Sequence, residues 1–246
     1  MNARMLADPS HVLVDDPDLG GALEGRRLRT AQRDLIAATM IAYEGPWEPE
    51  RDAETVRGGI GLLLLEGLVV RRVGRTGRFG AELLGPGDLM RPWQHDGEDA
   101  TLPFDTSFRV IEQTRLALLD LRFAARAAPY PEVTGALVGR AMQRSRILVV
   151  NMAIAHHPRV DRRLLMLMWH LADRWGRVTP DGIRIPLRLT HQLLADLVAS
   201  RRPSVTTGLQ QLTREGNLSR AGDAWMLHGE PPDELYEVPR ALTPRA

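Results

Sequence analysis

The sequence predicts an α+β protein in which an antiparallel β unit is followed by one long helix and then by a helix-turn-helix. Three observations predict this fold class. Short apolar runs separated by glycine-bearing turns occupy residues 56–122. An amphipathic pattern without proline covers 132–157. Two short apolar segments with helical periodicity lie on either side of a brief interruption in 189–218.

Length and composition fit one large domain or two modest ones. The chain has 246 residues, of which 43% are hydrophobic and 26% are charged. It has no cysteine, which excludes disulfides, thiolate metal sites, iron–sulfur ligation and cysteine nucleophiles. The longest apolar run, in 60–70, contains Glu66 and Gly67 and is too short to span a bilayer. Because the N-terminus also lacks the pattern of a signal peptide, we expect a cytoplasmic protein without a membrane partner.

The net charge of +1 conceals a basic block. All 32 basic residues are arginines, because the chain has no lysine. Residues 1–130 carry 16 arginines against 20 acidic residues, whereas 161–220 carry 10 arginines against 5 acidic residues. Such a block can bind a phosphate backbone, although an arginine-rich surface that faces only solvent would have the same composition.

The β unit is expected after an ambiguous N-terminal segment. Residues 1–25 are polar and weakly patterned, which fits a loose arm or a first pair of strands, and 26–45 mixes helical and extended signals. From 56 to 122, apolar runs alternate with turns such as Gly85–Asp88, in which glycine can take a positive φ and Pro86 fixes its own φ. This alternation is typical of antiparallel strands joined by tight turns.

Two helices are expected between the β unit and the helix-turn-helix. Pro131 suits the first turn of a helix. Apolar residues recur at three- and four-residue steps from there to His157, and Pro158 ends the run. A second helix is expected over 159–175, with Gly176 as its stop.

The stretch 189–218 has the pattern of two helices packed together. Thr190 suits the N-cap of the first helix, the small residue Ala199 permits close approach at the interruption, and Pro203 fits the first turn of the second helix. Each helix has one apolar face, made by Leu193, Leu194, Leu197 and Val198 in the first and by Val205, Leu209 and Leu212 in the second. The opposite face of the second helix carries Arg202, Ser204, Thr206, Thr207 and Gln210.

This polar face indicates nucleic-acid binding. In a helix-turn-helix the second helix enters the major groove of DNA. Arginine can bond guanine through two donors, glutamine can bond adenine, and serine and threonine can bond base edges or phosphates. A helix that faces only solvent would more often carry Glu–Arg pairs at four-residue spacing. An ordinary helical hairpin, or an interaction module that binds protein, is the alternative.

The same stretch resembles the C-terminal winged helix-turn-helix of Crp/Fnr transcription regulators, whose motif runs close to "LT-Q-LA-LV--SR-SV---L--L--EG-L". The matches run in order from Leu189 to Leu218, and "SRAGDAWML", with a hairpin turning at Ala221–Asp223, matches the wing. The resemblance implies that Arg202 reads guanine. It implies a DNA-contacting set in which the first three members touch the backbone: Thr190, His191, Arg201, Arg202, Pro203, Ser204, Thr206, Thr207 and Gln210.

The order of the predicted elements also resembles this family. The resemblance implies an N-terminal antiparallel β-roll (a double-stranded β-helix) over 1–131, a long dimerisation helix over 132–158 and a winged helix-turn-helix over 159–246. It therefore implies a homodimeric, sequence-specific transcription regulator that binds a near-palindromic site on double-stranded DNA. RNA polymerase is a further candidate partner.

The sequence departs from the family's pattern at the segment that binds the ligand in other members. Cyclic-nucleotide-binding members carry a glycine–glutamate pair, whose glutamate binds the ribose, and then an arginine before a small hydroxyl residue, which binds the cyclic phosphate. Here Gly97–Glu98 is present, but no Arg-Ser or Arg-Thr pair follows at short range. We therefore expect no control by cyclic nucleotides of the family's usual kind. The absence of cysteine excludes the family's iron–sulfur oxygen sensor.

An effector of another kind is the alternative. It would be cAMP bound differently, c-di-GMP or another small molecule held in the β-roll. Arg91, Trp93 and Glu98 are the candidate contacts, although their segment can equally be a packed loop.

We expect no cofactor, no metal site and no enzyme. His156 and His157 are adjacent, so on a helix they point about 100° apart and share an ion poorly. Glu98 and Asp99 are accompanied by neither a nucleophile nor a glycine-rich phosphate loop.

Overall fold

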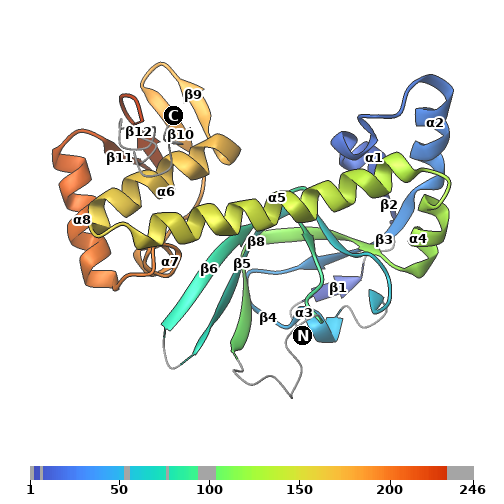
Figure 1. Ribbon diagram of the computed structural model, residues 1–246, viewed down its shortest axis with the longest axis horizontal. Helices are drawn as coiled ribbons and strands as arrows, with labels where there is room; N and C mark the ends of the chain where they lie inside the picture. Colours follow the sequence, from blue (N-terminus) through green and yellow to red (C-terminus); the bar gives the residue numbers. More distant parts are fainter. Residues whose placement is uncertain (1–2, 6–7, 53–55, 76–77, 94–103, 232–246) are drawn as a thin grey trace, which may run out of the picture. The chain divides into compact units, whose positions relative to one another are not determined.

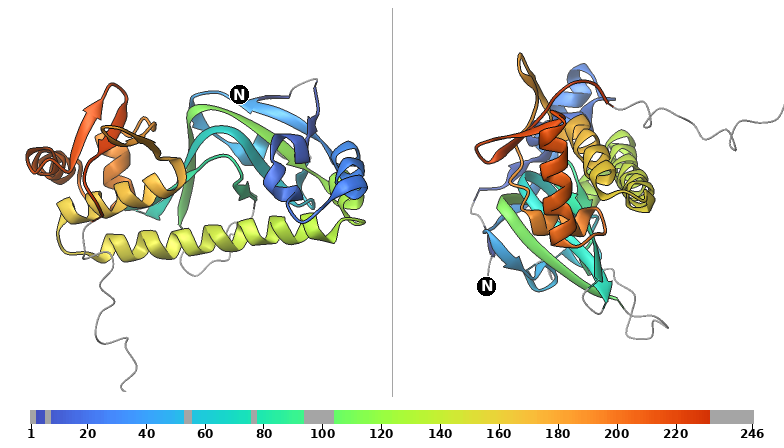
Figure 2. Two further views of the ribbon diagram at one scale, coloured as in Figure 1. Left: turned by 90° about the horizontal axis from the view of Figure 1, so that it is seen from above. Right: turned by 90° about the vertical axis from the view of Figure 1, so that its left-hand side faces the viewer.

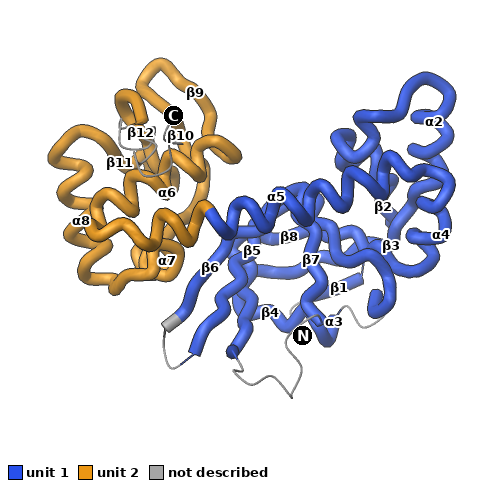
Figure 3. The backbone as a smooth tube through the Cα atoms, in the orientation of Figure 1, with its two compact units in different colours: residues 1–149 blue, residues 150–246 orange. Residues whose placement is uncertain are grey.

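The computed structural model describes residues 3–5, 8–52, 56–75, 78–93 and 104–231. The chain divides into two units, Met1–Val149 and Val150–Ala246, each with its own core (Figure 3). The division falls inside one helix, so the domain boundaries expected at 131/132 and 158/159 stay a prediction. No helix of the described residues has the length and apolar character needed to span a membrane.

The first unit is built on an antiparallel sheet whose central strands are β5 (Gly61–Arg75) and β8 (Asp105–Leu119), paired along almost their whole length. The strand order is β1-β3-β8-β5-β6 (Figure 1). Three short strands pair at the sides, β2 with β3, β4 with β8 and β7 with β5. The remaining strands of this sheet are β1 (Ala3–Met5), β2 (Ser10–His11), β3 (Ile36–Ala42), β4 (Gly45–Trp47), β6 (Arg78–Leu84) and β7 (Leu89–Met90).

The continuous apolar run at the start of β5 is explained by burial on both faces of the sheet. Leu62 and Leu64 belong to a core cluster that includes Met40, Trp47 and Phe108. Leu63 and Leu65 belong to a second cluster on the side covered by helices. Because successive side chains of a strand point to opposite faces, a strand buried on both sides has no polar alternation to show.

Glu66 and Gly67 lie inside β5, at a bulge in its pairing with β8. The pairing of β5 with β8 shifts register between Leu64 and Val69. Gly67 has a φ of 89°, and a Cβ added there would lie 2.6 Å from Thr114 Cα. Only glycine fits this bulge, which lets the long strand curl.

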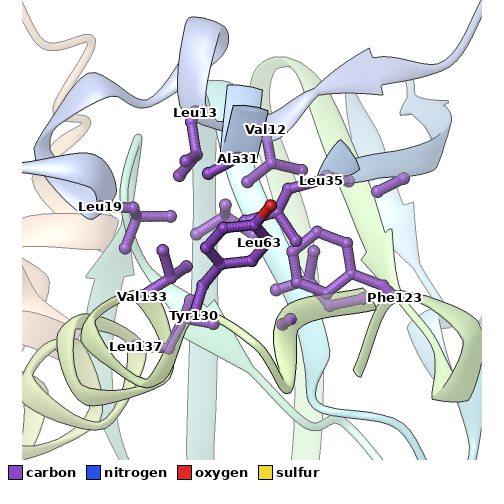
Figure 4. Close-up of a cluster of buried hydrophobic side chains, with 14 of the residues drawn as sticks. Val12, Leu13, Leu19, Ala31, Leu35, Leu63, Phe123, Tyr130, Val133 and Leu137 are labelled. Carbon is purple, nitrogen blue, oxygen red and sulfur yellow. The ribbon is translucent and has the colours of Figure 1, made fainter. Parts of the chain in front are cut away.

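The N-terminal segment differs from the expected loose arm or strand pair. Two short strands are present, but helices α1 (Val12–Asp15), η1 (Pro17–Gly20) and α2 (Gly25–Asp34) dominate it. Together with α4 (Leu121–Ala127) they cover one face of the sheet, and Figure 4 shows their apolar side chains gathered around Leu63 and Tyr130. A further short helix, α3, spans Pro49–Asp52.

Helix α5 (Pro131–His156) follows the expected bounds and lies beside the sheet of the first unit (Figures 1 and 2). Val133 and Leu137 enter the helix-covered core. One turn further, Arg140 Nη2 lies 3.1 Å from Asp16 Oδ1. After another turn, Arg144 donates to both carboxylate oxygens of Glu82, at 3.1 and 2.5 Å.

Of the carboxylates that pair with Arg140 and Arg144 of α5, Glu82 is the most buried, with only 4% of its side chain exposed. Arg71 Nε lies 2.5 Å from Glu82 Oε1, so two guanidinium groups share one carboxylate. Burial lowers the pKa of Arg71, and burial also raises the pKa of Asp16, which pairs with Arg140 of α5. A buried charge is tolerated only when it is paired, so these contacts fix the rotation of α5 against the sheet.

The second unit packs three helices on a four-stranded antiparallel sheet of order β11-β12-β10-β9. Helix α6 (Val160–Trp175) packs closely against α8 (Arg202–Arg214). The contact is close at Gly208 of α8, because a Cβ added there would lie only 2.8 Å from Leu164 Cδ1 of α6. The smaller elements are β9 (Arg177–Thr179), β10 (Gly182–Ile185), α7 (His191–Leu197), β11 (Leu218–Ala221) and β12 (Ala224–Leu227).

The turn between α7 and α8 is a helix-terminating motif with an unusual residue at its centre. Ser200 N donates to Ala195 O at 2.8 Å and Ala199 N donates to Asp196 O at 3.4 Å, the two bonds of a Schellman motif. Ala199 has a φ of +49°, where glycine is normally found. Ala199 therefore adopts a left-handed conformation, while the close approach that its small size permits stays a prediction.

We predict that Ala199→Gly stabilises the second unit by about 1 kcal/mol, because glycine removes the cost of a left-handed L-residue. Urea unfolding followed by circular dichroism measures the change. Ala153→Gly, at an exposed position inside α5, is the matched control and should destabilise by about 0.5–1 kcal/mol. A loss of stability in Ala199→Gly would contradict the assignment.

Candidate nucleic-acid interface

Helix α8 has one buried and one exposed face, as the sequence predicted. Val205, Gly208, Leu209 and Leu212 are buried. The helix begins at Arg202 with Arg201 as its N-cap, and Pro203 lies in its first turn, as the sequence predicted. The exposed residues of the predicted DNA-contacting set on this helix are Arg202, Pro203, Ser204, Thr207 and Gln210, whereas Thr206 is half-buried.

Two arginines lie at the N-terminus of this helix. Arg201 and Arg202 are exposed, and neither side chain makes an ion pair or hydrogen bond with any other described residue. In contrast, Arg140 and Arg144 of α5 are held by carboxylates. The partial positive charge of a helix N-terminus adds to that of the two guanidinium groups. This end of α8 therefore suits a phosphate or the acceptor edge of guanine.

The two threonines of α8 use their hydroxyl protons within the helix. Thr206 Oγ1 donates to Arg202 O at 3.1 Å, and Thr207 Oγ1 donates to Pro203 O at 3.2 Å. Their free lone pairs can accept from a base amino group, and their methyl groups can contact thymine. His191 Nδ1 lies 3.0 Å from Thr206 Oγ1. Thr206 therefore contacts both the start of α8 and the first residue of α7.

Thr190 occupies the N-cap of α7 that the sequence predicted. Its Oγ1 accepts a hydrogen bond from Leu193 N at 3.2 Å, and the residue is exposed. The hydroxyl proton is left to point outward. Thr190, His191 and Arg201 therefore come from the start of α7 and the turn before α8. Their contact with a DNA backbone stays a prediction.

The wing and the segment before α7 contribute two cations, Arg220 and Arg188, that were not among the predicted site residues. Arg220 of β11 stacks over the Trp225 ring, with its Cζ 4.3 Å from the ring centroid. Arg188 lies 3.5 Å from Asp223 in the β11–β12 turn. His228 joins this hairpin to the β9–β10 turn, because its Nε2 lies 2.7 Å from Ser219 Oγ and its Nδ1 lies 2.9 Å from Asp181 O. Arg220 lies inside the predicted wing hairpin, and this position in the sequence could have indicated it as a further cation of the site.

The predicted ligand-pocket residues are only partly brought together. Arg91 lines an apolar groove of about 380 Å³ against α5, with Leu137 and Ser145 on the opposite wall. Its Cζ lies 5.8 Å from the centroid of the Trp93 ring, and Trp93 packs against the core cluster of the sheet rather than lining the groove. Glu98, like Gly97 and Asp99, lies outside the described residues. Within the described part of the chain, no three histidine or acidic side chains gather into a metal site.

Comparison with known proteins identifies the second unit. Residues 159–228 match the family model described as the Crp-like helix-turn-helix domain. A curated relative, the global nitrogen regulator of Synechocystis sp., is 42% identical over 76 residues, which are 30% of this chain. The chain spans 33% of the length of that relative. The family that the motif in 189–218 indicated is confirmed for this part of the chain.

Solved structures extend the likeness to the whole fold. A CooA variant from Carboxydothermus hydrogenoformans gives a TM-score of 0.63 at 15% identity, covering 91% of this chain and 93% of that one. A cyclic nucleotide-binding domain containing protein from Listeria monocytogenes gives 0.61 at 16% identity, covering 86% and 96%. These matches confirm the predicted fold class, with an N-terminal β-roll, a long helix and a C-terminal winged helix-turn-helix.

We predict that Arg202→Ala weakens binding to the protein's specific DNA site by about 1–3 kcal/mol, because a bidentate contact to guanine is lost. Fluorescence anisotropy with the wild-type site measures the loss. Arg214→Ala removes the same charge from the exposed last turn of α8 and should leave the affinity within about twofold. Equal losses for the two variants would contradict base reading by Arg202.

Proposed function

We propose that the protein is a homodimeric transcription regulator of Crp/Fnr type that binds a specific, near-palindromic DNA site through α8. The observation that carries the proposal is the polar, arginine-led exposed face of α8 in a domain that matches the Crp-like helix-turn-helix model. The relative with the matching domain is itself named as a regulator. In this proposal the protein acts by binding DNA rather than by catalysis, and it acts in the cytoplasm. RNA polymerase is a further candidate partner.

An exposed apolar stripe on α5 supports the dimer. Large apolar side chains are exposed at Val138, Met142, Val149 and Met152, by 55%, 70%, 65% and 61%. With Ser145 between them, they follow alternating steps of four and three residues, which is the seam of a coiled coil. The opposite face of the helix is the one that carries Leu137, Arg140 and Arg144. A second copy of α5 is the partner that matches this stripe in length and period.

A twofold dimer explains why the DNA site should be a near-palindrome. Two α8 helices related by a twofold axis would enter successive major-groove segments on one side of the duplex, about 34 Å apart. The net positive charge of 161–220, with 10 arginines against 5 acidic residues, favours approach to the phosphate backbone.

We infer no dependence on cyclic nucleotides of the family's usual kind. The sequence has no Arg-Ser or Arg-Thr pair shortly after Gly97–Glu98, and the groove beside Arg91 is mainly apolar. A molecule could shift the dimer between two states only by binding one state more tightly. An effector in the β-roll, such as cAMP, c-di-GMP or another small molecule, is the second candidate mode of control. A winged helix that binds protein is the rival function.

We predict that the purified, ligand-free protein selects a palindrome from a random duplex pool at near-physiological salt, with two half-sites about one helical turn apart. Sequencing of the bound fraction reads out the site, and the Arg202→Ala variant is the control. Binding that depends on salt but shows no sequence preference would contradict specific regulation. Recovery of no DNA, with or without added cyclic nucleotides and c-di-GMP, would favour the protein-binding rival.

We predict that Met142→Asp dissociates the dimer, because a pairing of α5 would bury the new carboxylates without partners. Sedimentation equilibrium should show a monomer, and affinity for the full palindrome should fall at least about tenfold. Gln143→Asp is the matched control, since this neighbour is exposed but off the apolar stripe. A Met142→Asp protein that stays dimeric would exclude this face of α5 as the interface.

A further inference from the structure

Arg163 is the side chain that joins three helix ends in the second unit. It lies in the first turn of α6 and is half-buried. Its Nε donates to His157 O, just after the last residue of α5. Its Nη1 donates to Val198 O at 3.2 Å and to Ala199 O at 3.3 Å, at the end of α7.

The three acceptors are carbonyls that helix geometry leaves without partners. The last carbonyls of an α-helix have no intrahelical donor and need another one. The Schellman motif of α7 uses the carbonyls of Ala195 and Asp196, which leaves those of Val198 and Ala199 to Arg163. His157 O lies where the chain turns at Pro158 from α5 into α6. One guanidinium group therefore completes both chain reversals.

The same first turn of α6 also contacts α8. A Cβ added at Gly208 would lie 2.8 Å from Leu164 Cδ1 and 3.4 Å from the Cα of Asp161. Arg163 and its neighbours on α6 thus contact the end of α5, the turn before α8, and α8 itself. The direction in which α8 leaves the turn is consequently tied to the end of α5.

We propose that Arg163 is a positioning residue for DNA reading, which sets the orientation of α8 relative to the end of α5 and thereby the spacing of the two half-sites in a dimer. This inference rests on the proposed function, since spacing has meaning only for a dimer that reads DNA. Arg163 itself contacts no base, because its donors are directed at His157, Val198 and Ala199.

Arginine suits this role better than any other side chain. Its planar fork has five donors in fixed directions, whereas lysine presents one compact group on a flexible stem. All three acceptors are neutral carbonyls. Replacing Arg163 therefore removes the link without leaving a buried carboxylate unpaired, and the helices keep their own apolar contacts.

The test compares a full palindrome, an isolated half-site and palindromes with altered spacing, all built from the sequence that the wild-type protein selects. Arg163→Met removes the link, Arg163→Lys keeps the charge with a single donor group, and Arg177→Met is the charge-matched control on the exposed strand β9. Affinities are measured by fluorescence anisotropy at one salt concentration, and folding is checked by circular dichroism.

We expect Arg163→Met to lose about tenfold or more in affinity for the full palindrome, with half-site affinity within about twofold, because two domains no longer engage the site together. It should also tolerate spacings that the wild type rejects. Arg163→Lys should fall between the two, and Arg177→Met should match the wild type. If Arg163→Met does not fold, the ratio of full-site to half-site affinity in Arg163→Lys decides.

An unchanged ratio and an unchanged spacing preference in the folded variants would overturn the proposal. Equal losses on the full site and the half-site would also overturn it, since they would reduce Arg163 to a general stabiliser. Failure of the proposed function gives a different result, because the wild-type protein itself would then select no DNA site.

Discussion

The structure depends on the way in which the two faces of α5 are used. One face is fixed to the sheet by Leu137 and by the pairs that Arg140 and Arg144 make with buried or half-buried carboxylates. These ion pairs set the rotation of the helix, because a slipped helix would leave Glu82 buried beside Arg71 alone. Another face of the helix is left with its methionines and valines exposed. The apolar stripe, and with it the proposed dimer, follows from how the first face is held.

Among the described residues, arginine makes many of the polar connections between distant parts of the chain. Arg144 joins α5 to β6, Arg163 joins two chain reversals, and Arg115 joins Asp15 to Glu66. Each uses several donors of one planar group, which a lysine could not supply in the same geometry. Arg201 and Arg202 differ from these residues, because they make no such link within the described residues. At Arg201 and Arg202 the guanidinium groups are therefore exposed at the start of α8 and are not used to hold the fold.

The helix-turn-helix was predictable because its signals are local. The cap at Thr190, the apolar spacing of Val205, Leu209 and Leu212, and the wing hairpin all lie within 40 residues of sequence, and the structure has each of them. The β region was equally predictable from its turns. The short helices before β3 were not, because α2 has only Ala31 as a buried residue and these helices depend on packing against the sheet.

Contacts between distant residues could not be read from the sequence. Glu82 and Arg144 are 62 positions apart, and Arg163 and Val198 are 35 apart. The sequence around Arg144 and Arg163 does not distinguish them from arginines that are exposed to solvent. The conformation of Ala199 was also hidden, since alanine rarely takes a positive φ and the Schellman motif normally contains glycine. At the site, the sequence identified Arg202, Ser204, Thr207 and Gln210 of α8 as exposed, but not that Thr206 is half-buried and contacts His191.

In the proposed dimer, two copies of α8 enter the major groove on one side of the duplex. Protection of guanine N7 from methylation by the bound protein tests it most directly, because N7 lies in the major groove. Two clusters of protected guanines are expected, centred about one helical turn apart on the selected site, with loss of protection at the guanine read by Arg202 in Arg202→Ala. A single protected cluster, or full occupancy of the site with no protected guanine, would contradict it.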